Sequence, residues 1–353
     1  MGKDSEYYKG KNHDMKAKLQ ELLTELPQPA RDYIYEKQVS AQPGTLIAYS
    51  YDLLTFFRFL RERNPYFAAR EIPKINTDDL ANLASEDMVE FQRYLEFNSI
   101  GESHENGKRA IARKMSPLRG MFKYLYEHEY IPKDPMQLVK LPVLKKDKNI
   151  IRMDNYEVRA ILNAIEYGNS QMSERQLKFA AITRERDLAI LTLMLNTGIR
   201  VSECAGLDVA DVNLIVNSLT IVRKGGGQDV IYFGDEVNEA LNTYINGERA
   251  NMIPEKDGEK ALFLSIQKKR ISVDAIENLV KKYAKMVVPG KKITPHKLRS
   301  TYGTALYRET GDIRLVADVL GHENVNTTID YYAAIDDEHK RLAAGAVDFN
   351  REK

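Results

Sequence analysis

Apolar residues recur at helical spacing along most of the 353-residue chain, and this repeat favours a mainly α-helical fold. In the segment 45–63, Leu46, Leu53, Phe57 and Leu60 fall on one face of a helix. Further segments expected to be helical are 15–26, 84–97, 108–130, 185–198, 272–287, 294–310 and 313–320. A chain of this length is typical of two domains, so the pattern predicts two mainly helical units.

A segment rich in proline and lysine, 131–149, interrupts the helical pattern and marks the boundary between the units. We therefore predict a helical bundle over 15–140, a basic linker over 141–153 and a second domain over 154–353. The polar residues 1–14 are predicted to form a disordered tail.

Proline and glycine positions predict the local breaks in this pattern. Pro117 lies inside a helical segment, and because proline removes a hydrogen bond and clashes with the preceding turn, we expect a kink or a helix start near Ser116. The glycines of "KGGGQ" lie between β-rich arms and predict a hairpin over 218–233. We also expect a short strand at 262–265 and an extended insert at 166–183.

The overall charge is nearly balanced, with 52 Lys and Arg against 51 Asp and Glu, so a signal for a nucleic-acid partner must be local. Between Glu105 and Lys148, eleven basic residues stand against five acidic ones. Such a run is typical either of a solvated surface or of one that binds a phosphate backbone, and both interpretations stay open. The candidate DNA contacts are Lys108, Arg109, Arg113, Lys114, Lys145, Lys146, Lys292 and Lys297.

The single cysteine, Cys204, excludes an internal disulfide and suits a reducing compartment. The sequence has no charged-then-apolar leader and no run of about 18 apolar residues. We therefore expect a cytoplasmic protein without membrane insertion.

Six polar residues occur in a fixed order at conspicuous places, such as the glycine break before Arg200, the hairpin tip and one face of a predicted helix. They are Arg200, Lys224, His296, Arg299, His322 and Tyr331. Lys224 follows the first arginine by 24 residues, and Tyr331 follows the second histidine by nine. Each residue alone is a weak signal, but the ordered set, with the segments "TPHKLRSTYGTALY" and "VLGHENVNTTIDYY", resembles the tyrosine recombinase family. The Xer recombinases, in particular the single-protein type, are the most similar subgroup.

The resemblance implies that a tyrosine attacks a DNA phosphodiester and leaves a 3′-phosphotyrosyl link. Arg200 and Arg299 would hold the non-bridging oxygens, because a guanidinium fork matches a phosphate. His296 would assist as general base, Lys224 would protonate the leaving 5′-oxygen, and His322 would donate a hydrogen bond to the phosphate. Glu203 would orient Arg200 or His296.

The nucleophile is one of two adjacent tyrosines. The nine-residue spacing from His322 selects Tyr331, whereas Tyr332 would project about 100° away on a helix. No nucleotide or other cofactor is needed, because the covalent link conserves the energy of the phosphodiester. The sequence shows no metal-ligand spacing, and "KGGG" lacks the P-loop pattern.

The resemblance also implies the architecture and the partners. It implies a SAM-like core-binding domain at the N-terminus and a mostly α catalytic domain with a small antiparallel sheet. It implies a homotetramer on two double-stranded DNA sites with paired inverted half-sites, acting through a Holliday junction. Segment 336–349 would dock on a neighbouring protomer, and an accessory or activating protein is a further expected partner.

Several functions remain open on the residues alone. The first is chromosome-dimer resolution, and the second is integration or excision of a mobile element. A type IB topoisomerase and a non-catalytic DNA-binding protein on the same scaffold are further alternatives. The complete catalytic set argues against the last of these, because binding alone needs neither Lys224 nor Tyr331.

Overall fold

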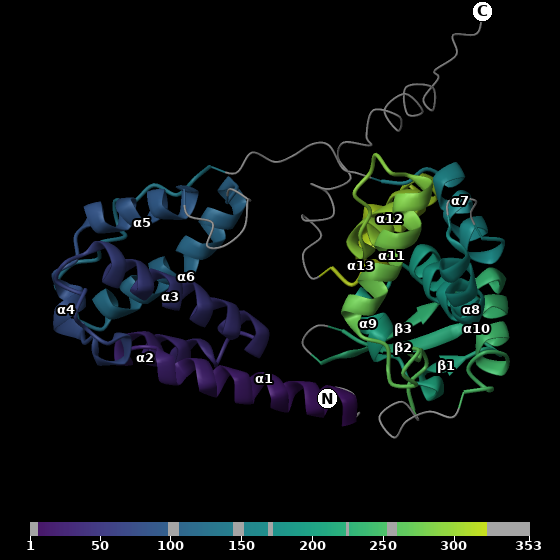
Figure 1. Ribbon diagram of the computed structural model, residues 1–353, viewed down its shortest axis with the longest axis horizontal. Coiled ribbons are helices and arrows are strands. Elements are labelled where there is room, and N and C mark those ends of the chain that lie inside the picture. The colour runs from purple at the N-terminus through teal and green to yellow at the C-terminus, as the bar shows by residue number, and fades with distance from the viewer. Residues whose placement is uncertain are drawn as a thin grey trace, which may run out of the picture. The chain divides into compact units, whose positions relative to one another are not determined.

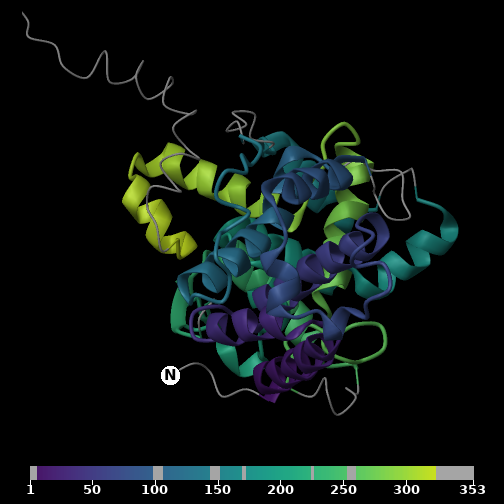
Figure 2. The same ribbon diagram turned by 90° about the vertical axis from the view of Figure 1, so that its left-hand side faces the viewer.

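The computed structural model describes residues 6–97, 106–143, 152–168, 172–223, 226–252 and 260–322. The chain divides into two compact units, Asp4–Lys146 and Asp147–Lys353, the latter grouped with Met1–Lys3 (Figure 1, and Figure 2 after a quarter turn). Each unit has its own core of buried apolar side chains. The prediction of a mainly α chain with one small antiparallel sheet is confirmed. No helix in the described part of the chain is long and apolar enough to cross a membrane.

The first unit is a helical bundle around a group of phenylalanines. Its elements are α1 (Glu6–Glu25), α2 (Gln28–Lys37), α3 (Pro43–Arg63), the 3-10 helix η1 (Ile72–Lys74), α4 (Thr77–Ala81), α5 (Ser85–Phe97) and α6 (Lys108–Glu127). Phe56 of α3 makes edge-on contacts with Phe91 of α5 and Phe122 of α6, at centroid distances of 5.1 and 6.0 Å. These side chains are buried, as the helical spacing predicts.

Two expectations for this unit are corrected. Helix α1 begins at Glu6, within the segment expected to be a disordered tail. Its second half buries Leu19, Leu22 and Leu23, and once such a nucleus exists each further turn adds hydrogen bonds at low cost. Helix α6 runs through Pro117, so the helix start expected near Ser116 is wrong, whereas the kink stays a prediction. The proline is itself buried, as are Met115 and Leu118, and this packing outweighs one lost hydrogen bond.

The second unit packs helices around a small sheet. Its elements are α7 (Asn155–Glu166), α8 (Glu174–Thr197), α9 (Val201–Gly206), the 3-10 helix η2 (Val209–Asp211), β1 (Val212–Asn213), β2 (Ser218–Val222), β3 (Gln228–Tyr232), α10 (Asp235–Asn246), α11 (Val273–Val287), α12 (Pro295–Thr310) and α13 (Ile313–Leu320). Helix α8 contacts α7, α10 and α12, and so forms the centre of the unit (Figure 1).

The sheet has the strand order β1-β2-β3 and is antiparallel throughout. Leu219 pairs with Ile231 across the predicted hairpin, and both side chains are buried, whereas Tyr232 is exposed. The strand expected at 262–265 is wrong, since Leu264 forms only an isolated bridge with Arg270.

The described part of the insert at 166–183 is mostly helix. Ser173 caps α8 and forms a reciprocal capping box with Gln176, so that α8 begins at Glu174 and not near residue 185. The predicted boundaries of the domains remain predictions, although the division at Asp147 falls within the expected linker.

Candidate active site

The site is built on the end of α8. Gly198 ends this helix in the left-handed conformation, with φ of 62°. A Cβ at this position would lie 2.6 Å from Cδ1 of Tyr302 and 2.8 Å from Cδ2 of Leu320. Glycine is therefore favoured here, because it adopts the positive φ without strain and leaves room for the two neighbouring side chains. The turn leads directly to Arg200, the N-cap of α9.

Arg200 is paired with Glu203 one turn later in α9. Nη1 of Arg200 donates to Oε1 of Glu203 at 2.8 Å, and its backbone N–H donates to Oε2 at 2.9 Å. Nη2 donates to the carbonyl of Gly321 at 2.9 Å. The side chain of Glu203 is buried, whereas that of Arg200 is 31% exposed. Within the described ranges the Nε–H of Arg200 has no protein partner, so part of its fork is available to a ligand.

Helix α12 contributes two residues from its first two turns. Thr294 precedes the helix and Pro295 occupies its first position, as the sequence predicts. Arg299 is buried and donates from Nη1 to the carbonyl of Gly198 at 2.6 Å and from Nη2 to the carbonyl of Leu320. His296 keeps part of its surface exposed to solvent.

Partial burial and the positive charges of Lys297, Arg299 and Arg200 lower the pKa of His296. The lowered pKa keeps this imidazole neutral near pH 7, and a neutral imidazole can accept a proton.

His322 follows the end of α13. Gly321 ends that helix with φ of 59°, and the backbone N–H of His322 donates to the carbonyl of Ala317 at 2.9 Å. Burial, with the charges of Arg299, Arg200 and two further neighbours, lowers the pKa of His322 to about 4. Its ring is therefore neutral at pH 7 and can donate one hydrogen bond.

Arg223 also belongs to the site, although the sequence interpretation overlooked it. It follows β2 and donates from Nε to Asp229 at 2.9 Å and from Nη2 to the carbonyl of Val319 at 3.0 Å. Its Nη1 lies 3.5 Å from Oε2 of Glu203. One signal was available, because alternation along β2 places position 223 on the same face as the buried Leu219 and Ile221.

Five of the predicted site residues are thus brought together, from α9 with its N-cap, from α12 and from the segment after α13. They are Arg200, Glu203, His296, Arg299 and His322. Lys224, Tyr331, Lys145, Lys146 and the segment 336–349 lie outside the described residues. The choice of Tyr331 over Tyr332 therefore stays a prediction.

The predicted DNA contacts that are described lie at two places. Lys108 and Arg109 are exposed in the first turn of α6, and Lys292 and Lys297 lie before and within the start of α12. The other two are held by a buried carboxylate of α3. Arg113 bonds both oxygens of Asp52, at 2.6 and 3.1 Å, and Lys114 lies 3.7 Å away. Burial raises the pKa of Asp52 despite these cations.

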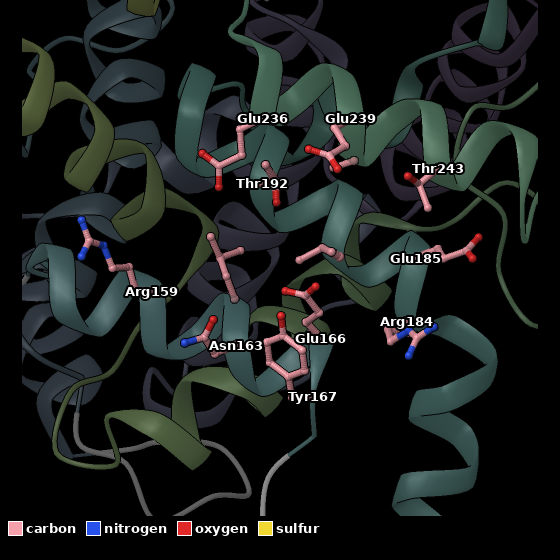
Figure 3. A pocket seen from close by; sticks show the side chains of 13 residues that line it. Arg159, Asn163, Glu166, Tyr167, Arg184, Glu185, Thr192, Glu236, Glu239 and Thr243 are labelled. Carbon is pink, nitrogen blue, oxygen red and sulfur yellow. The ribbon is translucent and has the colours of Figure 1, made fainter.

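A separate cavity of about 560 Å³ lies between α7, α8 and α10. Figure 3 shows its lining, which includes Arg159, Glu166, Glu236 and Glu239. None of the predicted catalytic residues lines it. Among the residues that the structure describes, no three His, Cys, Asp or Glu side chains are grouped to hold a metal ion.

Known proteins are similar to this chain in both sequence and fold. The sequence model of the phage integrase family matches residues 152–339, a segment that contains all six predicted catalytic positions. Tyrosine recombinase XerC of Caldanaerobacter subterraneus is 36% identical over 308 residues, covering 85% of this chain and 80% of that protein. Tyrosine recombinase XerS of Streptococcus agalactiae is 32% identical over 348 residues, covering 92% and 96%.

Solved structures agree on the fold. A XerH recombinase in a post-cleavage complex with a palindromic difH substrate matches with a TM-score of 0.64 and 19% identity, over 88% of this chain and 82% of that one. A lambda integrase dimer bound to a COC′ core site matches with a TM-score of 0.58 and 15% identity, over 85% and 95%. The family match covers more than half of the chain, and two relatives exceed 30% identity over most of it. The chain therefore belongs to the phage integrase family of tyrosine recombinases.

Proposed function

We propose that this tyrosine recombinase cuts and rejoins DNA at a specific site through a 3′-phosphotyrosyl intermediate and a Holliday junction. The convergence of two arginines and two neutral histidines on the ends of α8 and α13 supports this proposal most directly. A phosphodiester under attack gains negative charge on its non-bridging oxygens, and fixed cations in a partly buried site stabilise that charge.

Arg200 and Arg299 would stabilise the phosphate in different ways. Arg200 is partly exposed and retains an unused Nε–H among the described residues, so it would bind the phosphate directly. Arg299 already holds the carbonyls of Gly198 and Leu320. It would act on the phosphate through its charge, and directly only when one of these bonds is exchanged.

The proton transfers would involve His296, Lys224 and Tyr331. A phenol has a pKa near 10, so its attack needs a base, and His296 would take the proton as the tyrosine oxygen bonds to phosphorus. The bond from phosphorus to the 5′-oxygen breaks, and Lys224 would give that oxygen a proton. His322 would donate a hydrogen bond to the phosphate. Rejoining is the reverse reaction with a different 5′-hydroxyl.

The partner we propose is double-stranded DNA with paired inverted half-sites, bound by a homotetramer. The XerH structure contains a palindromic substrate and the lambda integrase structure a dimer on a core site, which supports this kind of target. Lys108, Arg109 and Lys292 are exposed and would contact phosphates, together with the basic residues 145, 146 and 297. Arg113 would do so from a fixed position on Asp52.

The role we propose is chromosome-dimer resolution in the cytoplasm, with an accessory protein as a further partner. Relatives named XerC and XerS match over most of their lengths, which favours this role. Integration or excision of a mobile element is the second candidate, because a transposon integrase shares the fold with a TM-score of 0.57. Recombination between two copies of one site, without a second attachment sequence, would favour the first.

Covalent capture tests the proposed chemistry. The full chain is mixed with a nicked duplex carrying a site selected from random DNA by the protein itself, and protein bound to DNA after SDS treatment is measured. We expect a band that Tyr331→Phe abolishes and Tyr332→Phe retains. The opposite pattern would move the nucleophile to Tyr332.

Two outcomes would overturn the proposal. Tight binding to the selected DNA with no covalent band in any form would favour a DNA-binding protein without catalysis. A band of equal intensity on unrelated nicked DNA, with relaxation of supercoiled plasmid, would favour a topoisomerase.

A further inference from the structure

Arg223 differs from Arg200 in how its guanidinium is used. Each of its three nitrogens faces a protein acceptor. Nε and Nη2 bond the carboxylate of Asp229, and Nη2 also bonds the carbonyl of Val319. Nη1 lies 3.5 Å from Oε2 of Glu203 and 3.5 Å from the carbonyl oxygen of Leu320. Its side chain is 13% exposed, less than half the value for Arg200. Such an arginine has little capacity to bind a substrate phosphate, but it can fix the groups around it.

The first of these groups is the carboxylate of Glu203. Oε1 receives the hydrogen bond from Nη1 of Arg200, whereas Oε2 receives the backbone N–H of Arg200 and faces Arg223. The carboxylate is buried and lies between two arginines. Its orientation, and with it the orientation of the Arg200 fork, therefore depends on a charge on each side.

The second group is the C-terminal end of α13. Among the described residues, this helix packs in a small apolar cluster whose buried members are Val316 and Leu320. Its last carbonyls carry the partial negative charge of a helix end, and Arg223 bonds the carbonyl of Val319. Gly321 approaches so closely that a Cβ there would lie 2.7 Å from Cζ of Arg223. His322 follows directly.

We infer that Arg223 is a positioning residue of the recombination site, which orients Glu203 toward Arg200 and holds the end of α13, with His322, against the phosphate-binding arginines. The inference rests on the proposed function for its catalytic consequence. Its structural part concerns the protein alone and is tested without DNA.

The DNA-free test measures the titration of His322 in the full chain. Histidines are labelled with ¹⁵N, and the His322 signal is assigned by its loss in His322→Gln. We expect Arg223→Gln to raise the pKa of His322 from about 4 toward its ordinary value of 6.5, because a positive charge and a hold on α13 are both removed. An unchanged titration of His322 would overturn the inference.

Two further variants separate positioning from general destabilisation. Arg186→Gln removes another buried arginine, which bonds Asp187 and the carbonyl of Leu264 in the middle of α8, and it should leave the titration of His322 unchanged. Asp229→Asn weakens an anchor of Arg223 at a half-exposed position, so this variant should fold if Arg223→Gln does not. Because the charge of Arg223 remains and only its anchoring is weakened, Asp229→Asn should slow formation of the covalent complex by less than Arg223→Gln does, and an unchanged rate would count against the inference.

The catalytic test uses the nicked duplex described above. Arg223→Gln should slow formation of the covalent complex by about 100-fold, the scale of a misplacement of about 1 Å in a site, while its affinity for an intact half-site stays within about twofold. Equal losses of affinity and rate, or a rate like that of Arg186→Gln, would refute a positioning role. If the unmodified protein forms no covalent complex, the proposed function fails, and the titration still decides whether Arg223 positions His322.

Discussion

Replacing Glu203 by glutamine is the sharpest test of how the site is held together. The carboxylate is 3% exposed and accepts two hydrogen bonds from Arg200, at 2.8 and 2.9 Å, and a longer contact from Arg223. Glutamine has nearly the same volume, so packing is preserved. It removes the charge, and its amide NH₂ can only donate, which turns one oxygen position from an attractive contact into a repulsive one.

The expected loss of stability follows from these contacts. Removing one partner of a fully buried ion pair costs about 3–5 kcal/mol. Here Arg200 is partly solvated and the contact with Arg223 is long, so a lower figure of about 2–3 kcal/mol applies. That is a change of roughly 30- to 150-fold in the unfolding equilibrium of the second unit.

Urea denaturation followed by circular dichroism measures this change, with Asp229→Asn as the matched control. Asp229 also pairs with Arg223, but it is 44% exposed, so its loss should cost about 1 kcal/mol or less. In covalent capture, Glu203→Gln should react about 100-fold more slowly than the unmodified protein, because the Arg200 fork loses its orientation. If Glu203→Gln is no less stable than Asp229→Asn and reacts at the normal rate, the reasoning from burial is refuted.

Three further results are expected. Gly198→Ala should lower the free energy of unfolding by about 2 kcal/mol more than Gly311→Ala. Both glycines have φ near 60–65°, but of the two only Gly198 is enclosed by side chains. Equal urea midpoints for the two variants would show that Tyr302 and Leu320 move aside without cost. In the folded state His322 stays neutral down to about pH 4, whereas in the unfolded chain it binds a proton near pH 6.5. The free energy of unfolding should therefore rise with pH between these two values. His322→Gln should flatten this rise, as measured by the urea midpoint. Arg113→Ala should lower the slope of log half-site affinity against log salt concentration by about one unit, because one phosphate contact is lost. It should also destabilise the first unit, because Asp52 is 4% exposed and loses its bidentate partner. A change in stability with an unaltered salt slope would exclude a phosphate contact.

Most of the helices could be predicted from the helical pattern, and most of the site residues from the order of the polar residues. Periodicity located α3 and α11, because both bury several large apolar side chains. Helix α12 was located by its start at Thr294 and Pro295, although its buried residues are mostly small or polar. Periodicity failed where tertiary packing decided the outcome. The exposed first turns of α1 extend a helix nucleated further along, and Pro117 is tolerated because its neighbours are buried.

The predicted site residues came from motif order, which does not reveal how charges are satisfied. Arg299 is buried against two carbonyls, and Arg113 against a carboxylate of another helix. Neither partner is near in sequence. Arg223 was missed for the same reason, since its acceptors come from α9, β3 and the end of α13.

The separate apolar cores of the two units affect how this protein can change over generations. A substitution that weakens the bundle around Phe56 lowers the stability of the first unit. It leaves the core around α8 unchanged, because that core consists of different side chains. The surface residues of the first unit that we propose to contact DNA can therefore be altered without loosening the arginines and histidines of the second. New target sites and unchanged chemistry are compatible outcomes of mutation in a chain built this way.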